Sequence, residues 1–225
     1  AKHLFEARDV EFPPAYHPFL KRHLKIGFDR FEYGIVKRRV VEGTSEDDDL
    51  WRRGHPIVFP NILRTGGGSG GPEFQYRVPV DDTHTLQIAY TCYDPGPGAH
   101  VPAQDVVPYY DVPLKDAQGR HAVEFTVGQD FMAWVTQGPT AERDLERLGE
   151  SDKGIILYRR LLREQMERVA EGVDPMCVFR DPAQNLRVDL ESEVSFYGRR
   201  RRTGTYRYTA QGFSPIIELV EGLFE

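Results

Sequence analysis

The sequence lacks the features that would assign it to a membrane, to a secretory route or to a nucleic acid. Its 225 residues contain no apolar run of about 18 residues, and the N-terminus lacks the apolar stretch of a signal peptide. The formal net charge is −6, whereas phosphate binding requires a basic excess over a broad face. We therefore expect a cytoplasmic protein that binds neither membrane nor nucleic acid.

Metal-binding pairs of cysteine and histidine are also missing. Cys92 and Cys177 stand outside any C-x-x-C or C-x-H pair, so we interpret both as reduced core residues. No two histidines have the spacing that places both on one helical face, although a non-haem Fe(II) site takes two imidazoles and one carboxylate. The seven histidines are His3, His17, His23, His55, His84, His100 and His121.

The chain does contain enough apolar material for a sizeable core, with 40% hydrophobic and 12% aromatic residues. Residues 55–65 predict a strand broken by Pro60. Residues 85–92 alternate strictly between apolar and polar side chains, which predicts a half-buried antiparallel strand. A short helical pattern precedes the strands at Phe19, Leu20, His23, Leu24 and Ile26.

A long helix is predicted for residues 151–171, with Gly172 and Pro175 just beyond its end. Residues 94–113 are rich in proline and glycine and predict a long loop of the kind that borders a pocket. Together these patterns predict an α+β domain whose curved sheet grips the helix and leaves a cavity between them. The apolar stripe of the helix consists of Ile155, Tyr158, Leu162, Met166 and Val169.

Three polar segments are explained better by turn chemistry than by a binding function. Residues 66–71 lack the lysine of a phosphate-binding loop and predict a hairpin loop. The sequence VDDTHT at residues 80–85 predicts a turn stabilised by Asp and Thr side chains rather than a metal site. The basic run at residues 199–202 predicts a solvated turn rather than a docking patch for an acidic partner.

Asp130 is the residue most open to a chemical role. It stands among Gln129, Phe131, Met132 and Trp134 at the start of a helical segment, where it could cap the first turn or project into the cavity as a carboxylate metal ligand. Asn61 shares a strand face with apolar residues, so its amide requires either a buried structural partner or a ligand.

Several phrases of the sequence, taken in order, resemble the C-terminal catalytic domain of Rieske-type aromatic ring-hydroxylating oxygenases. The similarity is to the branch that includes phthalate dioxygenase and related O-demethylases. The phrases are KIGFDRFEYGIVKRR (25–39), GHPIVFPNILR (54–64), FQYRVPVDDTHTL (74–86), QDFMAWVTQGPTAERDLERLGESDKGIILY (129–158) and EGVDPMCVFRDPAQN (171–185).

The resemblance implies that residues 1–225 form one catalytic domain with the helix-grip (START/Bet v1-like) fold. Its cavity would hold a mononuclear Fe(II) bound by two histidines and one aspartate, and the motif places that catalytic aspartate at Asp130. From strand facing and proximity to Asp130, the candidate substrate-binding residues are Phe59, Asn61, Gln129, Phe131 and Trp134. Arg64 could pair with a substrate carboxylate, with solvent exposure as its alternative.

The resemblance also implies components that the chain does not contain. The motif of the Rieske [2Fe-2S] cluster and the helix with the two iron-binding histidines lie upstream in the family, so both are expected in an N-terminal domain absent from this chain. Electrons from NAD(P)H would pass through a reductase or ferredoxin to the cluster and across a subunit boundary of a homotrimer. The complete enzyme would use O₂ to hydroxylate or O-demethylate an aromatic substrate.

Two other functions compete with an oxygenase domain. A non-catalytic helix-grip module would bind a small apolar or aromatic ligand without a metal, and removal of the Asp130 carboxylate would leave that binding intact. An interaction subunit that has lost its own site would fill the cavity with side chains.

Overall fold

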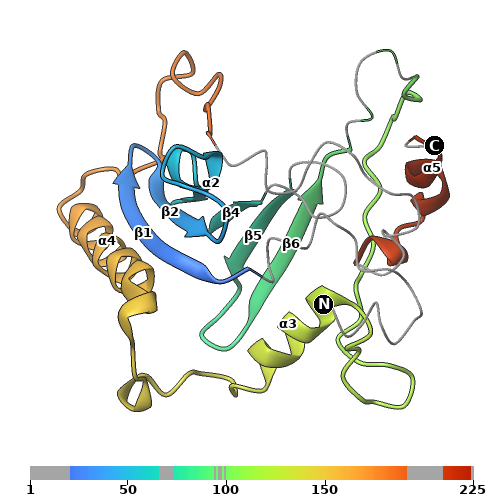
Figure 1. Cartoon of the computed structure of the whole chain (residues 1–225), viewed down its shortest axis with the longest axis horizontal. Helices are drawn as coiled ribbons and strands as arrows, with labels where there is room; N and C mark the ends of the chain where they lie inside the picture. Colours follow the sequence, from blue (N-terminus) through green and yellow to red (C-terminus); the bar gives the residue numbers. More distant parts are fainter. Residues whose placement is uncertain are drawn as a thin grey trace.

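The computed structural model describes residues 21–65, 73–93, 95, 98, 100–191 and 210–223. Within these ranges all strands precede the helices except the short α2, which makes the architecture α+β (Figure 1). No helix in these ranges has the length and apolar character needed to cross a bilayer. The elements in chain order are β1 (His23–Phe31), β2 (Gly34–Val41), α2 (Asp49–Arg52), β3 (His55–Val58), β4 (Ile62–Thr65), β5 (Glu73–Pro79), β6 (Thr85–Thr91), α3 (Thr126–Val135), η2 (Arg143–Leu145), η3 (Glu150–Asp152), α4 (Lys153–Ala170), η5 (Ala210–Phe213) and α5 (Ile217–Gly222).

The strands of the described residues form one antiparallel sheet in the order β1-β2-β3-β4-β5-β6. Each strand pairs with the next in sequence, which tight connections allow because neighbouring strands run in opposite directions. In the β5–β6 turn, Asp81 Oδ1 accepts hydrogen bonds from the backbone N–H groups of Thr83 and His84, both at 2.8 Å. The turn predicted at residues 80–85 is therefore confirmed.

Helix α4 covers the β1–β3 end of one sheet face, and it lies beside β1 in Figure 1. Ile35 of β2, Phe59 and Leu161 of α4 form a buried cluster, with Ile57, Leu157, Tyr158 and Leu162 packed around it. Each side chain of this kind contributes roughly 1.5–3 kcal/mol when fully buried. This cluster is the main apolar core between sheet and helix in the described part of the chain.

A close approach of α4 to the sheet depends on Gly154. A Cβ atom added at Gly154 would overlap the ring of Phe28 on β1. Further along the same helix, Glu164 forms an ion pair with Arg30 of β1 at 2.8 Å. Helix α4 thus contacts the edge strand β1 through close packing at Gly154 and through the ion pair of Glu164.

The opposite sheet face has a different cover. Helix α2 packs there against β1, with the Trp51 ring against Gly27 and the Lys25 ammonium 4.2 Å from the ring centroid. At the other end of this face the apolar side chains of β5 and β6 stay exposed in the described structure: Val78, Leu86, Ile88 and Tyr90. The alternation of residues 85–92 correctly predicts a strand, although its apolar side is the more exposed one.

One local prediction is wrong, and another is right only in part. His23, Leu24 and Ile26 belong to β1 rather than to a helix, because pairing with β2 overrides a helical spacing of only a few residues; Phe19 and Leu20 lie outside the described residues. The predicted break at Pro60 is confirmed, but residues 55–65 form two strands that pair with each other, and the turn between them contains a cis peptide bond between Phe59 and Pro60.

The predicted long helix is confirmed as α4, but only Tyr158 and Leu162 of the predicted stripe pack against the apolar core. Gly154, Leu161 and Gln165 are the buried positions, whereas Ile155, Met166 and Val169 of the stripe are exposed. Helix α4 carries apolar residues on two adjacent faces, and periodicity alone does not say which face meets the sheet. The loop predicted at residues 66–71 and the turn predicted at residues 199–202 lie outside the described residues.

Candidate functional site

Helix α3 carries most of the predicted site residues. Asp130 lies inside this helix, and the N-cap position is occupied by Phe125 without a side-chain cap. The N-cap role considered for Asp130 is therefore wrong. Trp134 follows Asp130 by four residues, so the two side chains share one face of α3.

The Asp130 carboxyl group sits in an environment that disfavours its charge. Loss of hydration raises its pKa above the ordinary aspartate value, and the nearby Arg77 guanidinium lowers it by a smaller amount. The same electrostatic interaction with Asp130 opposes the effect of burial, which lowers the pKa of Arg77. The two groups thus influence each other across the space between α3 and β5.

Strand β5 presents a polar row to the helix-bearing side of the sheet. Gln75 lies on the same face as Ile35 of the apolar core, because direct cross-strand pairs connect Ile35 to Ile57, Ile57 to Leu63 and Leu63 to Gln75. Glu73 and Arg77 flank Gln75 at period two and therefore share this face. The polar row Glu73, Gln75 and Arg77 continues the surface that α4 covers at its apolar end.

The polar row is connected by hydrogen bonds. The Gln75 amide donates to Glu73 Oε1 at 2.7 Å, and Arg77 donates to Gln75 Oε1 at 3.0 Å. Thr91 Oγ1 and Gln211 Nε2 donate to Glu73 Oε2 at 3.1 and 3.3 Å, and Glu73 is only 8% exposed. The buried carboxylate is therefore satisfied by neutral donors rather than by a cation at hydrogen-bonding distance.

The three remaining predicted residues of α3 have distinct surroundings. The Trp134 ring lies 5.6 Å from the guanidinium carbon of Arg77. Phe131 packs against Trp134, with ring centroids 5.7 Å apart. Gln129 donates from Nε2 to the Val123 carbonyl at 3.1 Å, which gives it a structural bond. Trp134 and Asp130 are thus brought near Arg77, and Phe131 supports the Trp134 ring.

Asn61 and Phe59 lie in the turn between β3 and β4 rather than along one strand. Asn61 Nδ2 donates to the Arg77 carbonyl at 2.8 Å, so its amide has the structural partner that the sequence left open. Phe59 is 6% exposed and belongs to the apolar cluster with Leu161. Contact of either residue with substrate stays a prediction.

The donor groups of the described residues limit what metal site they can form. Asp130 offers one oxygen donor, but no group of three His, Cys, Asp or Glu side chains that could hold a metal occurs in the described ranges. Of the seven histidines, His3 and His17 lie outside those ranges. The described part of the chain therefore does not supply a complete iron triad by itself.

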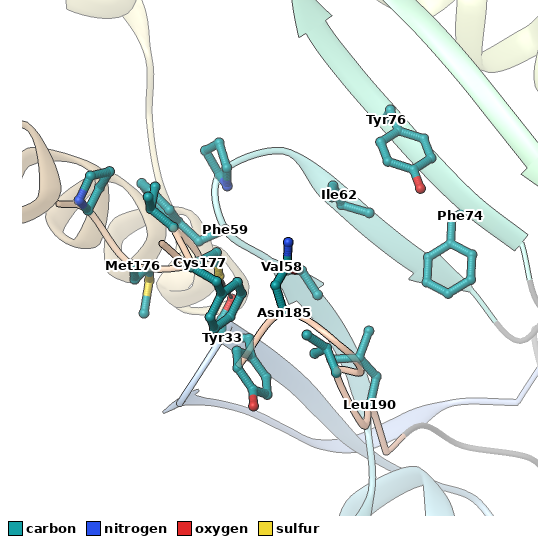
Figure 2. Close-up of a pocket in the computed structure, with 15 residues that line it drawn as sticks. Tyr33, Val58, Phe59, Ile62, Phe74, Tyr76, Met176, Cys177, Asn185 and Leu190 are labelled. Carbon is teal, nitrogen blue, oxygen red and sulfur yellow. Dashed lines mark hydrogen bonds between the residues drawn. The ribbon is translucent and has the colours of Figure 1, made fainter. Parts of the chain in front are cut away.

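A cavity of about 600 Å³ opens on the other face of the sheet. Figure 2 shows Phe74 and Tyr76 of β5, Ile62 of β4 and Val58 of β3 on one side of it, and Asn185 and Leu190 of the late loop on another. Phe59 also lines it, whereas Asp130 and Trp134 do not. The cavity expected between sheet and helix is thus not the one seen here.

Sequence reasoning missed the polar row of β5. The segment EFQYRVP alternates polar and apolar residues, which is the signal of a strand with two unlike faces. The apolar face of such a strand is usually expected to face the core. Only the cross-strand register shows that here the polar face lies on the side of α4.

Comparison with known proteins gives the class of the chain. Residues 114–192 match the family described as LigXa C-terminal domain like. The chain is 37% identical over 173 residues to the 5,5'-dehydrodivanillate O-demethylase oxygenase subunit of Sphingobium sp. (strain NBRC 103272 / SYK-6). The aligned region covers 77% of this chain and 40% of that protein.

Two further relatives are more distant. Identity is 30% with the tert-butanol monooxygenase / tert-amyl alcohol desaturase oxygenase subunit of Aquincola tertiaricarbonis, over 52% of this chain and 28% of that protein. It is also 30% with the phthalate 4,5-dioxygenase oxygenase subunit of Pseudomonas putida, over 43% of this chain and 27% of that protein. The chain thus spans less than half the length of these curated relatives.

The matches define the chain as related to oxygenase subunits. More particularly, these matches support a Rieske-type oxygenase catalytic domain, which the sequence segments also resemble.

Proposed function

We propose that the chain forms the catalytic domain of a Rieske-type oxygenase that hydroxylates or O-demethylates an aromatic substrate with O₂. The observation that carries this proposal is the 37% identity to an O-demethylase oxygenase subunit over 77% of this chain. Asp130 lies inside both the sequence phrase that resembles the family and the matched segment 114–192.

In this proposal Asp130 is the carboxylate ligand of a mononuclear Fe(II). The group, when bound, supplies O₂ activation. Two observations support the position: Asp130 lies within α3 on the same face as Trp134, and it interacts electrostatically with Arg77 of the polar row. The two histidine ligands would come from parts of the protein outside the described residues.

The finer architecture is also part of the proposal. We assign the sheet and α4 to a helix-grip fold, because one face of a six-stranded antiparallel sheet packs on a single long helix. Residues 1–225 would then belong to one catalytic domain, with a Rieske [2Fe-2S] cluster carried elsewhere in the protein. The term oxygenase subunit in the relatives' names supports a separate reductase or ferredoxin. A homotrimer and a cytoplasmic location stay predictions.

The proposal is tested with the Asp130→Ala variant of the full-length protein. We expect bound iron to fall by about 10-fold or more, because loss of a direct ligand costs at least as much as loss of its supporting contacts. Turnover of an aromatic methyl ether with O₂ and the reductase should fall with it. Asp144→Ala removes an exposed carboxylate from the same region and should change neither quantity. Full iron occupancy in Asp130→Ala would refute the assignment.

A second function is favoured by the cavity in Figure 2. Its volume of about 600 Å³ and its aromatic lining suit a small apolar ligand bound without a metal. Val58→Trp should fill this cavity and abolish calorimetrically measured binding of 1-naphthol, whereas Asp130→Ala should leave that binding intact. Equal binding by Val58→Trp and the unmodified protein would exclude the cavity as a ligand site.

A further inference from the structure

The side chains that line the cavity in Figure 2 restrict what can bind there. Of the 15 described residues that line it, five are aromatic and none is Asp, Glu, Lys, Arg or His. An ionised ligand would lose its hydration in this cavity without meeting an opposite charge, which is unfavourable. Arg64 shares this sheet face through its pairing with Phe74, but it does not line the cavity. The lining therefore favours a neutral ligand with aromatic surface.

The volume of the cavity indicates the size of that ligand. An apolar cavity of about 150 Å³ holds one benzene ring. The cavity between the sheet and the late loop measures about 600 Å³, which exceeds what one ring requires. It also lies within the range of roughly 300–1,000 Å³ that is typical of small-molecule sites. Two linked aromatic rings with a polar substituent fit this volume.

Two neutral polar side chains on different walls of the cavity are available to orient such a ligand. Figure 2 shows Tyr76 on the sheet side and Asn185 on the side of the late loop. Neither the Tyr76 hydroxyl nor the Asn185 side-chain amide has a hydrogen-bond partner among the described residues. Because a phenol and an amide can each donate and accept, both suit a hydroxyl group of the ligand.

The late loop, residues 173–191, is fastened to helix α4 and forms a defined wall of the cavity. Gln165 of α4 is buried, and its Oε1 accepts a hydrogen bond from the Met176 N–H at 2.8 Å. Arg168, one turn further along α4, donates to the Asp174 carbonyl at 3.1 and 3.3 Å. The start of the loop is thus held by two side chains of one helix.

Cys177 shows how closely this loop meets the β1–β2 turn. Its backbone φ is 66°, a left-handed conformation that residues other than glycine seldom adopt. Its Sγ donates to the Tyr33 carbonyl at 3.4 Å, and the Phe179 ring lies 6.2 Å from the Tyr33 ring. Since these three residues also line the cavity, the contacts that hold the loop shape the cavity as well.

The cavity is separate from the proposed iron ligand. Its sheet residues Val58, Ile62 and Tyr76 are direct cross-strand partners and share one face. Gln75, the neighbour of Tyr76 on β5, points to the opposite face, where α4 packs. Asp130 does not line the cavity. A ligand bound here would therefore be held away from that carboxylate.

We propose that this cavity is a second binding site, specific for a neutral two-ring phenol held between β3–β5 and the late loop. The rings pack against the aromatic and aliphatic lining, and the ligand hydroxyl forms hydrogen bonds with Tyr76 and Asn185. The inference rests on the second function proposed above, in which the cavity binds an aromatic ligand. It does not depend on whether Asp130 binds iron.

The ligand class is tested by isothermal titration calorimetry at pH 7 with the full-length protein. The probes are 4-phenylphenol and biphenyl-4-carboxylate, which have similar size but differ in charge. The unmodified protein should bind the phenol at least about 10-fold more tightly than the carboxylate. Val58→Trp should fill the cavity and abolish binding of 4-phenylphenol. Val58→Ile, a small change at the same position, should keep the affinity within about 3-fold.

The polar contacts are tested by removing one group at a time. Tyr76→Phe and Asn185→Ala should each weaken binding of 4-phenylphenol by about 3- to 10-fold, the effect of one hydrogen bond. Tyr109→Phe removes the same hydroxyl from a side chain that is 92% exposed and does not line the cavity, so it should leave the affinity unchanged. Unchanged affinity in both Tyr76→Phe and Asn185→Ala would overturn the assigned contacts.

The possible failures can be told apart. Equal binding of 4-phenylphenol by Val58→Trp and the unmodified protein would overturn the second proposed function and this inference with it. Equal binding of phenol and carboxylate, abolished for both by Val58→Trp, would keep that function and overturn the neutral ligand class. If Val58→Trp does not fold by circular dichroism, hydrogen exchange of the unmodified protein decides. There 4-phenylphenol should slow exchange in the late loop, and no protection of that loop would end the proposal.

Discussion

One face of the sheet is built in two contrasting ways. At the β1–β3 end, Ile35 and Phe59 pack against Leu161 of α4 in a cluster with almost no exposed surface. At the β5–β6 end, the same face carries Glu73 and Arg77 together with Gln75, Gln87 and Thr91. Burying hydrogen-bonded polar groups adds little net stability, so the apolar end contributes more to the stability of the domain.

This contrast assigns different tasks to the two helices. Helix α4 meets the apolar end and holds the domain together, whereas α3 brings Trp134 near the polar end and carries Asp130. Changes at the apolar end should therefore lower the free energy of unfolding more than changes at the polar end. Four substitutions test that division.

The largest effect is expected from Leu161→Ala. Leu161 is 1% exposed in the apolar cluster, so its truncation should lower the free energy of unfolding by about 2–5 kcal/mol, measured by urea denaturation. Met166→Ala alters a residue of the same helix that is 63% exposed and should change stability by about 0.5 kcal/mol or less. Similar losses in the two variants would show that α4 packs through another face.

Gly154→Ala tests the close approach of α4 to β1. The added Cβ would overlap the Phe28 ring, so we expect a loss of about 1–3 kcal/mol as the helix shifts away. Gly149→Ala is the matched control, because its Cβ would lie 3.7 Å from the nearest Asp152 oxygen. A stable Gly154→Ala variant would mean that the ring moves aside without loss of packing.

Glu73→Gln tests the network at the polar end. The substituted amide places an N–H₂ group where Gln75, Thr91 or Gln211 now donates, so one buried donor loses its acceptor. We expect a loss of about 1–2 kcal/mol in the same denaturation measurement. Glu167→Gln, an exposed change on α4, should be neutral. Equal stability of both variants would show that the network adapts without loss.

The smallest effect is expected from Asp130→Asn in protein freed of metal by a chelator. Loss of hydration raises the pKa of Asp130 in the folded state, so its ionised form disfavours folding. The variant should be more stable than the unmodified protein at pH 7, by less than about 1 kcal/mol given solvent screening. That gain should shrink as the pH falls through the raised pKa towards the ordinary value. A variant less stable at pH 7 would contradict this sign.

Local patterns predicted several elements correctly because their signals are local. Strict alternation over residues 85–92 predicted β6, Asp81 predicted its own turn, and the spacing of apolar residues predicted α4. The short helical spacing at His23 and Ile26 failed, because pairing with β2 outweighs a weak local preference. The family resemblance came from the order of several phrases rather than from any single residue.

The candidate site was predicted only in part. Asp130 and Trp134 were selected because both lie in one segment that resembles the family, and their roles stay predictions; Asn61 was correctly expected to need a partner. The approach of Arg77 to Trp134 was missed, since nothing in the sequence says that β5 lies near a helix that follows it after a long connection.

The sequence by itself determined the element types, the tight turns and the family relationship, because these depend on residue spacing along the chain. The tertiary structure alone decided which face of α4 is buried, which side of β5 meets the helices and that Arg77 lies beside Trp134. The physical reason is that an alternating strand or a two-faced helix can turn either side inwards, and only cross-strand register and packing choose between them.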